Sequence, residues 1–95
     1  MFILELTYTA AIEKIDEQLI PHRSYLDLHY SKGNLICSGP QNPRTGGIIM
    51  TTFKSREEVD VFIAADPFQV FALADYRVIE FAPIKFDERF KPFIN

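Results

Sequence analysis

Apolar residues recur at helical spacing in the first third of the chain, and a histidine occupies one of these positions. The residues separated by three or four places are Ile12, Ile15, Leu19, His22 and Leu26, which puts them on one face of a helix. That face packs on the core, so His22 points inward or into a pocket lined by the core. The pattern predicts a helix from residue 10 to about residue 31, capped by Thr9.

Pro21 interrupts this helical pattern one residue before the histidine. Proline removes one helical hydrogen bond and disfavours the α conformation in the residue before it. The helix is therefore expected either to break just before His22 or to continue with a kink. If a new helix began at Pro21, His22 would lie in its first turn, where the helix dipole favours the neutral imidazole that a general base needs.

Apolar runs between turn signals predict four strands, over residues 2–8, 35–37, 48–53 and 76–83. Gly33 ends the first helix, and Ser55-Arg56-Glu57-Glu58 is a capping box that opens a second one. Asp66-Pro67 ends the second helix, a short helical turn over 68–74 follows, and residues 38–47 form a long loop. The order βαββαβ is the ferredoxin-like α+β fold, in a single domain spanning residues 1–95.

In this fold both helices cover one face of a four-stranded antiparallel sheet. The predicted strands are apolar on both sides, so the opposite face also carries hydrophobic side chains. A second copy packed face to face would bury them, and we therefore predict a homodimer. The tail over residues 84–95 contains Phe86, Phe90 and Phe93, and it either joins that interface or folds back on its own subunit.

Composition narrows the class of partner. The chain of 95 residues is 47% hydrophobic and has a net charge of −3. Lys and Arg form no cluster or stripe, so nucleic acid is not expected as a partner. No run approaches the ~20 apolar residues of a membrane span, and no secretory signal is visible. The single cysteine, Cys37, fits a cytoplasmic compartment, and its place in a strand predicts a buried, unreactive thiol.

His22 is the first candidate catalytic residue, and other segments could complete a site around it. Asp66 could orient its ring, although Asp before Pro is also an ordinary helix N-cap, and its two oxygens could serve both roles. Ser38 and Gly39 leave the second strand, where a glycine lets a ligand approach the backbone, or they form a plain turn. Arg44 could hold a phenolate, enolate or carboxylate, or remain solvated.

Metal and cofactor sites are not predicted. His22 and His29 lie seven residues apart, and the chain contains no C-x-x-C or H-x-x-x-H spacing. It also lacks the glycine-rich dinucleotide fingerprint and the P-loop. We interpret His29 as an exposed or interface residue.

Several short motifs, taken in order, resemble the YciI-like (YCII-related) family over essentially the whole chain. They are His22 with Leu26, Gly33-Asn34-Leu35, Ser38-Gly39-Pro40, Gly46-Gly47, Ala65-Asp66-Pro67-Phe68 and Tyr76-Arg77-Val78-Ile79-Glu80-Phe81. The resemblance implies a ferredoxin-like homodimer of the dimeric α/β-barrel type, with a pocket near His22 and Asp66 as its catalytic pair. One branch of this family contains dehydrochlorinases that remove HCl from chlorinated hydroxyhydroquinones.

Together these features predict a small cofactor-free enzyme, a lyase or isomerase, that acts on a small aromatic or acidic substrate. His22 would move a proton on a hydroxylated ring, with Asp66 orienting it and with Ser38, Gly39 and Arg44 binding the substrate. Two alternatives stay open. The chain could be a binding module that holds a ligand without turning it over, or a structural dimeric domain with His22 in its core.

Overall fold

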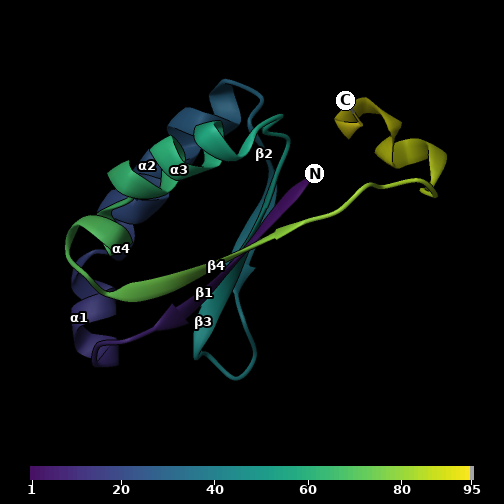
Figure 1. The fold of residues 1–95 in the computed structure, drawn as a ribbon. Coiled ribbons are helices and arrows are strands. Elements are labelled where there is room, and N and C mark those ends of the chain that lie inside the picture. The colour runs from purple at the N-terminus through teal and green to yellow at the C-terminus, as the bar shows by residue number, and fades with distance from the viewer. Residues whose placement is uncertain (95) are drawn as a thin grey trace.

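The computed structural model in Figure 1 describes residues 1–94 and contains a four-stranded antiparallel sheet. The strands lie in the order β2-β3-β1-β4, which confirms the predicted ferredoxin-like α+β fold. The elements, in chain order, are β1 Phe2–Tyr8, α1 Ile12–Glu17, α2 Leu19–Ser31, β2 Leu35–Pro40, β3 Gly46–Thr51, α3 Arg56–Ala65, α4 Pro67–Val70, β4 Ala74–Glu80 and the 3₁₀ helix η1 Glu88–Phe93.

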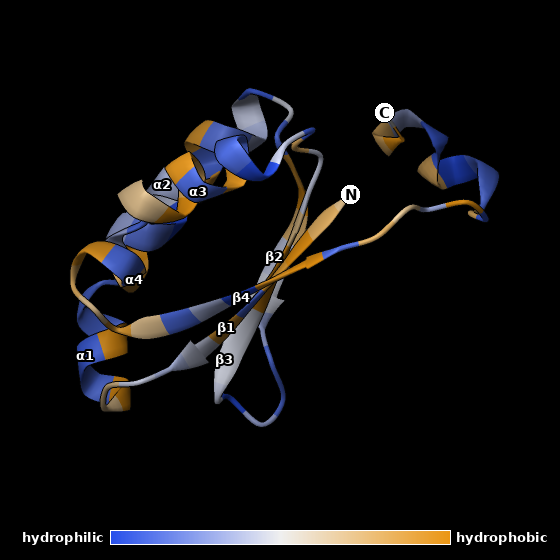
Figure 2. Ribbon diagram, viewed as in Figure 1, coloured by the Kyte–Doolittle hydropathy of each residue, from blue (hydrophilic) through white to orange (hydrophobic). Residues whose placement is uncertain are grey.

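The core lies between the sheet and the helices α2 and α3, which are on the same side of it (Figure 1). On β1, Phe2, Leu4 and Leu6 point toward the helices, and the residues between them point away. Each helix mixes hydrophilic and hydrophobic residues (Figure 2), and α3 directs Val59 and Phe62 inward. These five side chains are at most 3% exposed.

The first predicted helix is two helices, and the break lies at Gln18 instead of just before His22. Proline has no N–H to donate, so it is best tolerated in the first turn of a helix, where that donor has no intrahelical partner. α2 begins at Leu19, which makes Pro21 its third residue. His22 follows at the end of the first turn, and its N–H donates to the Gln18 carbonyl at 2.9 Å.

Two helix ends follow their sequence signals and one does not. Gly33 adopts a φ of +75° just after α2, as a C′ glycine does. Ser55 accepts a hydrogen bond from the Glu58 N–H, which confirms the predicted cap of α3. Thr9 does not cap a helix, because α1 begins later and has Ala11 at its N-cap.

Within residues 1–94, no helix combines the length and the apolarity that crossing a membrane requires.

The strands on either side of the long loop differ from the prediction. β2 continues to Pro40 and β3 begins at Gly46 and ends at Thr51, so the loop spans residues 41–45 and not 38–47. Gly39 pairs with Ile48, because the ladder passes straight through the Gly-Pro segment. A partner strand decides where pairing stops, and periodicity within one strand does not show it.

The segment between α4 and β4 is also shorter than predicted. α4 ends at residue 70, and β4 runs from residue 74 to 80 instead of from 76 to 83. Ala72 takes a left-handed φ of 54° and turns the chain into β4. Alanine rarely adopts a left-handed conformation, so nothing in the sequence indicated this turn.

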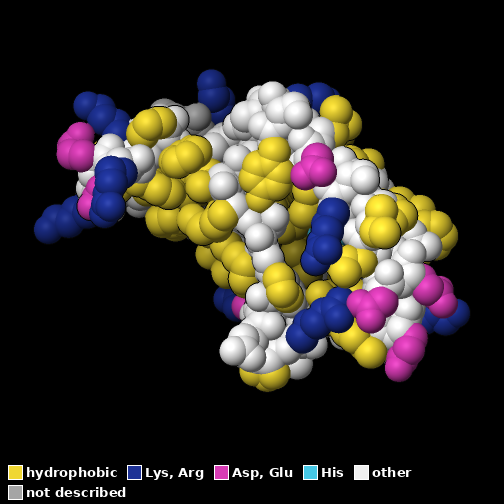
Figure 3. All heavy atoms as spheres, turned by 180° about the vertical axis from the view of Figure 1, so that it is seen from behind, with side chains coloured by type: hydrophobic (Ala, Val, Ile, Leu, Met, Phe, Trp, Pro, Cys, Tyr) yellow, Lys and Arg dark blue, Asp and Glu magenta, His cyan; other side chains and the backbone are white. Residues whose placement is uncertain are grey.

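The sheet face away from the helices carries apolar side chains from several strands. Ile3 on β1 lies between Met50 on β3 and Ile79 on β4, and all three are partly exposed. Cys37 pairs with Met50 but is exposed, so the predicted burial of this thiol is wrong. It lies on β2, an edge strand, at the outer face. Seen from behind, the molecule has a broad hydrophobic area next to charged side chains (Figure 3).

The C-terminal tail leaves the sheet and extends beyond its end (Figure 1). The side chains of Ile84 and Phe86 are 84% and 40% exposed. Phe90 and Phe93 pack on each other, with ring centroids 5.4 Å apart. Most of the described part of the tail therefore contributes little to the hydrophobic core.

Candidate functional site

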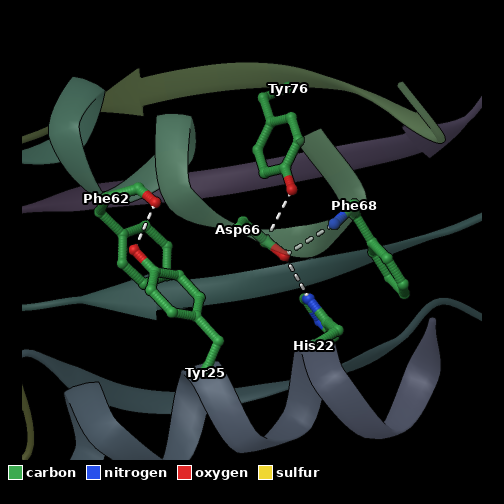
Figure 4. Close-up of polar contacts among 6 residues, drawn as sticks. All are labelled: His22, Tyr25, Phe62, Asp66, Phe68 and Tyr76. Carbon is green, nitrogen blue, oxygen red and sulfur yellow. Dashed lines mark hydrogen bonds and ion pairs between the residues drawn. The ribbon is translucent and has the colours of Figure 1, made fainter. Parts of the chain in front are cut away.

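The side chains of His22 and Asp66 form a buried pair between α2 and the start of α4 (Figure 4). Nδ1 of His22 lies 2.7 Å from Oδ1 of Asp66, although 44 residues separate them in the chain. His22 is 8% exposed and Asp66 is fully buried. The fold thus brings together the two residues that the sequence singled out for acid–base chemistry.

Asp66 is both the N-cap of α4 and the partner of the histidine. Its Oδ1 accepts hydrogen bonds from His22 and from the backbone N–H of Phe68, and its Oδ2 accepts one from the Tyr76 hydroxyl at 2.7 Å. Three converging donors suit an ionised carboxylate in a buried site. Because such a carboxylate only accepts hydrogen bonds, Nδ1 of His22 carries the ring proton and Nε2 is left as an acceptor.

The imidazole ring of His22 is fixed on two sides. It stacks on Phe68 with ring centroids 3.9 Å apart and an interplanar angle of 3°, while Asp66 holds Nδ1. Nε2 has no hydrogen-bond partner among the described residues, and no buried polar side-chain atom in residues 1–94 lacks one. It follows that Nε2 is accessible from the cavity that His22 lines.

That cavity has a volume of about 410 Å³ and opens between α2, the sheet and the 41–45 loop. This volume is within the ~300–1,000 Å³ range of small-molecule sites. His22, Ser38, Gly39 and Arg44 all line it, and Asp66 lies behind His22. The other lining residues are Leu6, Tyr8, Leu19, Arg23, Leu26, Pro40, Gly47, Ile48, Ile49 and Phe68.

The charged side chains around the cavity are basic. Among the described residues it is lined by Arg23 and Arg44 and by no Asp or Glu. Arg44 donates to Asp16 at 2.7 Å, and this bond, followed by one to Tyr8, raises the pKa of Arg44. Arg23 has no ion-pair partner in the part of the chain described. Arg23 is therefore the guanidinium that is free to meet an anionic ligand.

Ser38 and Gly39 offer the cavity two different features. The hydroxyls of Ser38 and Tyr30 share a hydrogen bond at 2.7 Å, so the serine is oriented by α2. Gly39 lines the cavity with backbone atoms alone, because it has no side chain. A ligand can therefore approach the β2 backbone closely at Gly39.

Two tyrosines lie near the buried pair, and both keep their protons. Burial, with a smaller effect of the Asp66 charge, raises the pKa of Tyr25 to about 12. Burial, followed by the charge of Asp66 and the hydrogen bond to it, raises the pKa of Tyr76 far above its usual range. The two phenols differ in their acceptors, because Tyr25 donates to the Phe62 carbonyl and Tyr76 donates to Asp66 (Figure 4).

Sequence reasoning assigned no role to four residues around the pair, which are Tyr8, Arg23, Phe68 and Tyr76. Arg23 follows His22 directly, so its place at the same end of α2 was the one available signal. Tyr76 pairs with the buried Leu6 of β1, which directs it toward the helices. That register depends on how two distant strands align, and the sequence does not show it.

His29 is less exposed than one of its two predicted states, an exposed residue, requires. It is half-buried against the rings of Phe53 and Phe62, and its Nδ1 lies 3.0 Å from the side-chain amide of Asn34. Burial, and then the charge of Lys32, lower the pKa of His29. In residues 1–94, no group of three or more His, Cys, Asp or Glu side chains is placed to hold a metal ion.

The structure is similar to that of 5-chloro-2-hydroxyhydroquinone dehydrochlorinase (TftG) from Burkholderia phenoliruptrix AC1100, solved in complex with 2,5-dihydroxybenzoquinone. The TM-score is 0.73 at 20% sequence identity, and the match covers 94% of this chain and 98% of that chain. At this identity the likeness supports the fold. No curated protein matches the sequence. The family model of the YCII-related domain matches residues 1–82, and the chain therefore belongs to the family of YCII-related domains.

Proposed function

We propose that the protein is an enzyme in which His22 acts as acid and base on a hydroxylated aromatic ring, with a chlorinated hydroxyhydroquinone as the leading substrate. One observation carries the proposal. Nδ1 of His22 is held by a buried carboxylate while Nε2 is open to a cavity of about 410 Å³. This arrangement fixes the tautomer in which Nε2 accepts a proton from a bound ligand.

The reaction would proceed by a proton shift from a hydroxyl to a ring carbon, then by a second deprotonation with the loss of chloride. Nε2 of His22 takes the proton of a ring hydroxyl and returns it to the ring carbon that bears chlorine. Nε2, neutral again, then takes the proton of a second hydroxyl as the carbon–chlorine bond breaks. The electrons of that O–H bond form the second carbonyl of a quinone, chloride leaves with the electron pair of its bond, and the imidazolium releases its proton to solvent. The net loss is HCl, and the ring keeps all of its oxygens. No external oxidant is required, because the departing chloride takes both electrons of the carbon–chlorine bond.

Asp66 would stabilise the imidazolium that forms between these proton movements. The ion pair is buried, so its Coulomb energy is screened less than it would be at the surface. Arg23 would stabilise negative charge that develops on the ring oxygens, and Ser38 would add a hydrogen bond. Arg44 can join them only if it gives up part of its bond to Asp16.

The size and charge of the cavity support the proposed substrate class. A volume of about 410 Å³ accommodates a single substituted ring, and its lining combines apolar side chains with two arginines and one histidine. The similar structure carries 2,5-dihydroxybenzoquinone, a ring of this size with acidic hydroxyls. A small aromatic acid or phenol therefore fits better than a neutral aliphatic molecule.

The proposal predicts chloride release from 5-chloro-2-hydroxyhydroquinone in oxygen-free buffer. Chloride is measured with an electrode and the quinone by its absorbance, and wild type should form both in equal amounts. His22→Gln should lower the rate by about 100-fold or more, because general acid–base catalysis contributes about 10²–10⁴. His29→Gln is the matched control, since His29 lies outside the cavity, and it should keep the wild-type rate.

If wild type released no more chloride than His22→Gln, the proposed reaction would be wrong. Tight binding of the ring by wild type, weakened by His22→Ala and without any product, would instead identify a binding module. If wild type neither bound the ring nor turned it over, His22 would be a structural residue of a dimeric domain.

We also propose that a second copy of the chain covers the outer face of the sheet. Ile3, Met50 and Ile79 form an apolar strip there. Light scattering should give twice the chain mass of 11.0 kDa. Ile79→Lys should shift the protein toward monomer, and Val61→Lys, on an exposed position of α3, should not. A wild-type monomer at millimolar concentration would contradict the proposal.

A further inference from the structure

We propose that Tyr76 is a positioning residue of the site, acting on His22 through Oδ2 of Asp66. The inference rests on the function proposed above, and it adds a third residue to the His22–Asp66 pair. Tyr76 does not line the cavity, so its hydroxyl does not touch a ligand bound there. Its effect would pass through the carboxylate.

The geometry connects the pair to the sheet. Tyr76 projects from β4, and its hydroxyl donates to Oδ2 of Asp66 at 2.7 Å. Oδ1 of the same carboxylate is held by the N–H of Phe68 at the start of α4. A carboxylate bound through both oxygens cannot rotate, so Oδ1 stays 2.7 Å from Nδ1 of His22. Together, β4 and α4 set the orientation of the histidine ring on α2.

The hydrogen bond also sets how strongly the carboxylate attracts a proton. A donor on Oδ2 draws negative charge away from Oδ1, which makes the carboxylate a weaker base toward His22. Burial raises the pKa of Tyr76, so the phenol remains a donor throughout the working pH range. Removing the hydroxyl would therefore make the His22–Asp66 pair take up its proton at a higher pH.

The other titratable or charged groups near the pair lack the direct hydrogen bond that Tyr76 makes to the carboxylate, among the described residues. Tyr25 feels the charge of Asp66, and the remaining charged or titratable neighbours line the cavity in front of the histidine. These neighbours are Tyr8, Arg23 and Arg44. Within residues 1–94, none of these groups forms a hydrogen bond with Asp66. Tyr76 does, and this distinguishes it from them.

The test is an NMR titration of the His22 ring in ligand-free protein, with His29 replaced by glutamine so that one ring signal remains. In Tyr76→Phe, the midpoint of the titration should rise by about one pH unit, as expected for the loss of one hydrogen bond to a charged group. Because no substrate is involved, the result holds even if the proposed reaction fails. Where turnover is measurable, the acidic limb of the kcat/KM profile should move in the same direction.

Tyr25→Phe is the matched control. It also removes one phenol hydroxyl from the neighbourhood of Asp66, but that hydroxyl is bonded to the Phe62 carbonyl. Both variants lose a hydrogen bond and some stability, and only Tyr76→Phe should move the midpoint. Equal shifts in the two variants, or no shift in Tyr76→Phe, would overturn the proposal.

A double variant tests whether Tyr76 acts through Asp66. In an Asp66→Asn background the carboxylate is absent, so Tyr76→Phe should leave the midpoint where Asp66→Asn alone puts it. Each variant is first checked for a folded NMR spectrum, and Tyr76→Met, which also lacks a hydrogen-bond donor, replaces Tyr76→Phe if the latter unfolds. An additive shift in the double variant would mean that Tyr76 reaches His22 by another route, and the proposal would be wrong.

Discussion

Replacing Asp66 by asparagine should leave the protein folded and lower turnover by about 10- to 1,000-fold. The loss comes from the negative charge, since an opposite charge in hydrogen-bond contact shifts a titration by about 1–3 units and each unit is a factor of ten. The same variant should lower the midpoint of the His22 NMR titration by about one unit or more. Both effects report on one quantity, the stability of the imidazolium beside the carboxylate.

The fold of this variant is expected to survive, because asparagine can keep the bonds made by Oδ1. The Phe68 N–H and the His22 Nδ1–H both point at that atom, so the amide oxygen stays there and the amide NH₂ faces the Tyr76 oxygen. The ring tautomer is therefore conserved, and only the charge is lost. Asp66→Ala is a poorer test, since it removes the α4 cap as well.

Asp27→Asn is the control for this prediction. Asp27 lies on α2, as His22 does, but its side chain is exposed and makes no ion pair within residues 1–94. It should leave turnover unchanged and should shift the midpoint of the His22 titration by no more than about 0.2 pH units, because exposed charges are strongly screened. An unchanged midpoint in Asp66→Asn would reduce Asp66 to a helix cap and favour the binding or structural alternatives.

The sequence predicted the members of the candidate site better than their surroundings. His22 stood out because it interrupts an apolar helix face, and Asp66 because it precedes Pro67 at a helix boundary. Both signals are local, and the family resemblance added the pairing between them. Neither the local patterns nor the resemblance assigned a role to Tyr76 or Arg23. The role of Tyr76 depends on strand register, and that of Arg23 depends on which charges remain unpaired.

For Arg44 and Cys37, the sequence predicted an environment that differs from the one in the structure. The sequence offered Arg44 as an anion-binding group, and the structure places it at the cavity but bonds it to Asp16, 28 residues earlier. Cys37 is apolar in pattern, yet it lies on the outer face of an edge strand. Which side of a strand faces the helices is decided by pairing, so a single strand in isolation leaves it open.

The fold itself depends strongly on one glycine, and Gly46→Ala should lower the free energy of unfolding by about 3 kcal/mol or more. Gly46 begins β3 opposite Thr7 of β1. A Cβ there would overlap the backbone carbonyl of Leu6 and approach the side chain of Gln41 to 2.8 Å. Leu6 lies on β1, one of the two interior strands, and is 2% exposed, so its backbone cannot move without disturbing the ladders to both β3 and β4.

Urea denaturation followed by circular dichroism measures this loss, and Gly39→Ala provides the comparison. Gly39 is also a strand glycine, on β2, but no heavy atom lies within 4 Å of its added Cβ. The Gly39 variant should therefore change the unfolding free energy by about 1 kcal/mol or less. If the two variants lost equal stability, the close approach of β3 to β1 would not be the cause. A loss confined to Gly46→Ala would assign the cause to the close contact between the start of β3 and the Leu6 carbonyl of β1.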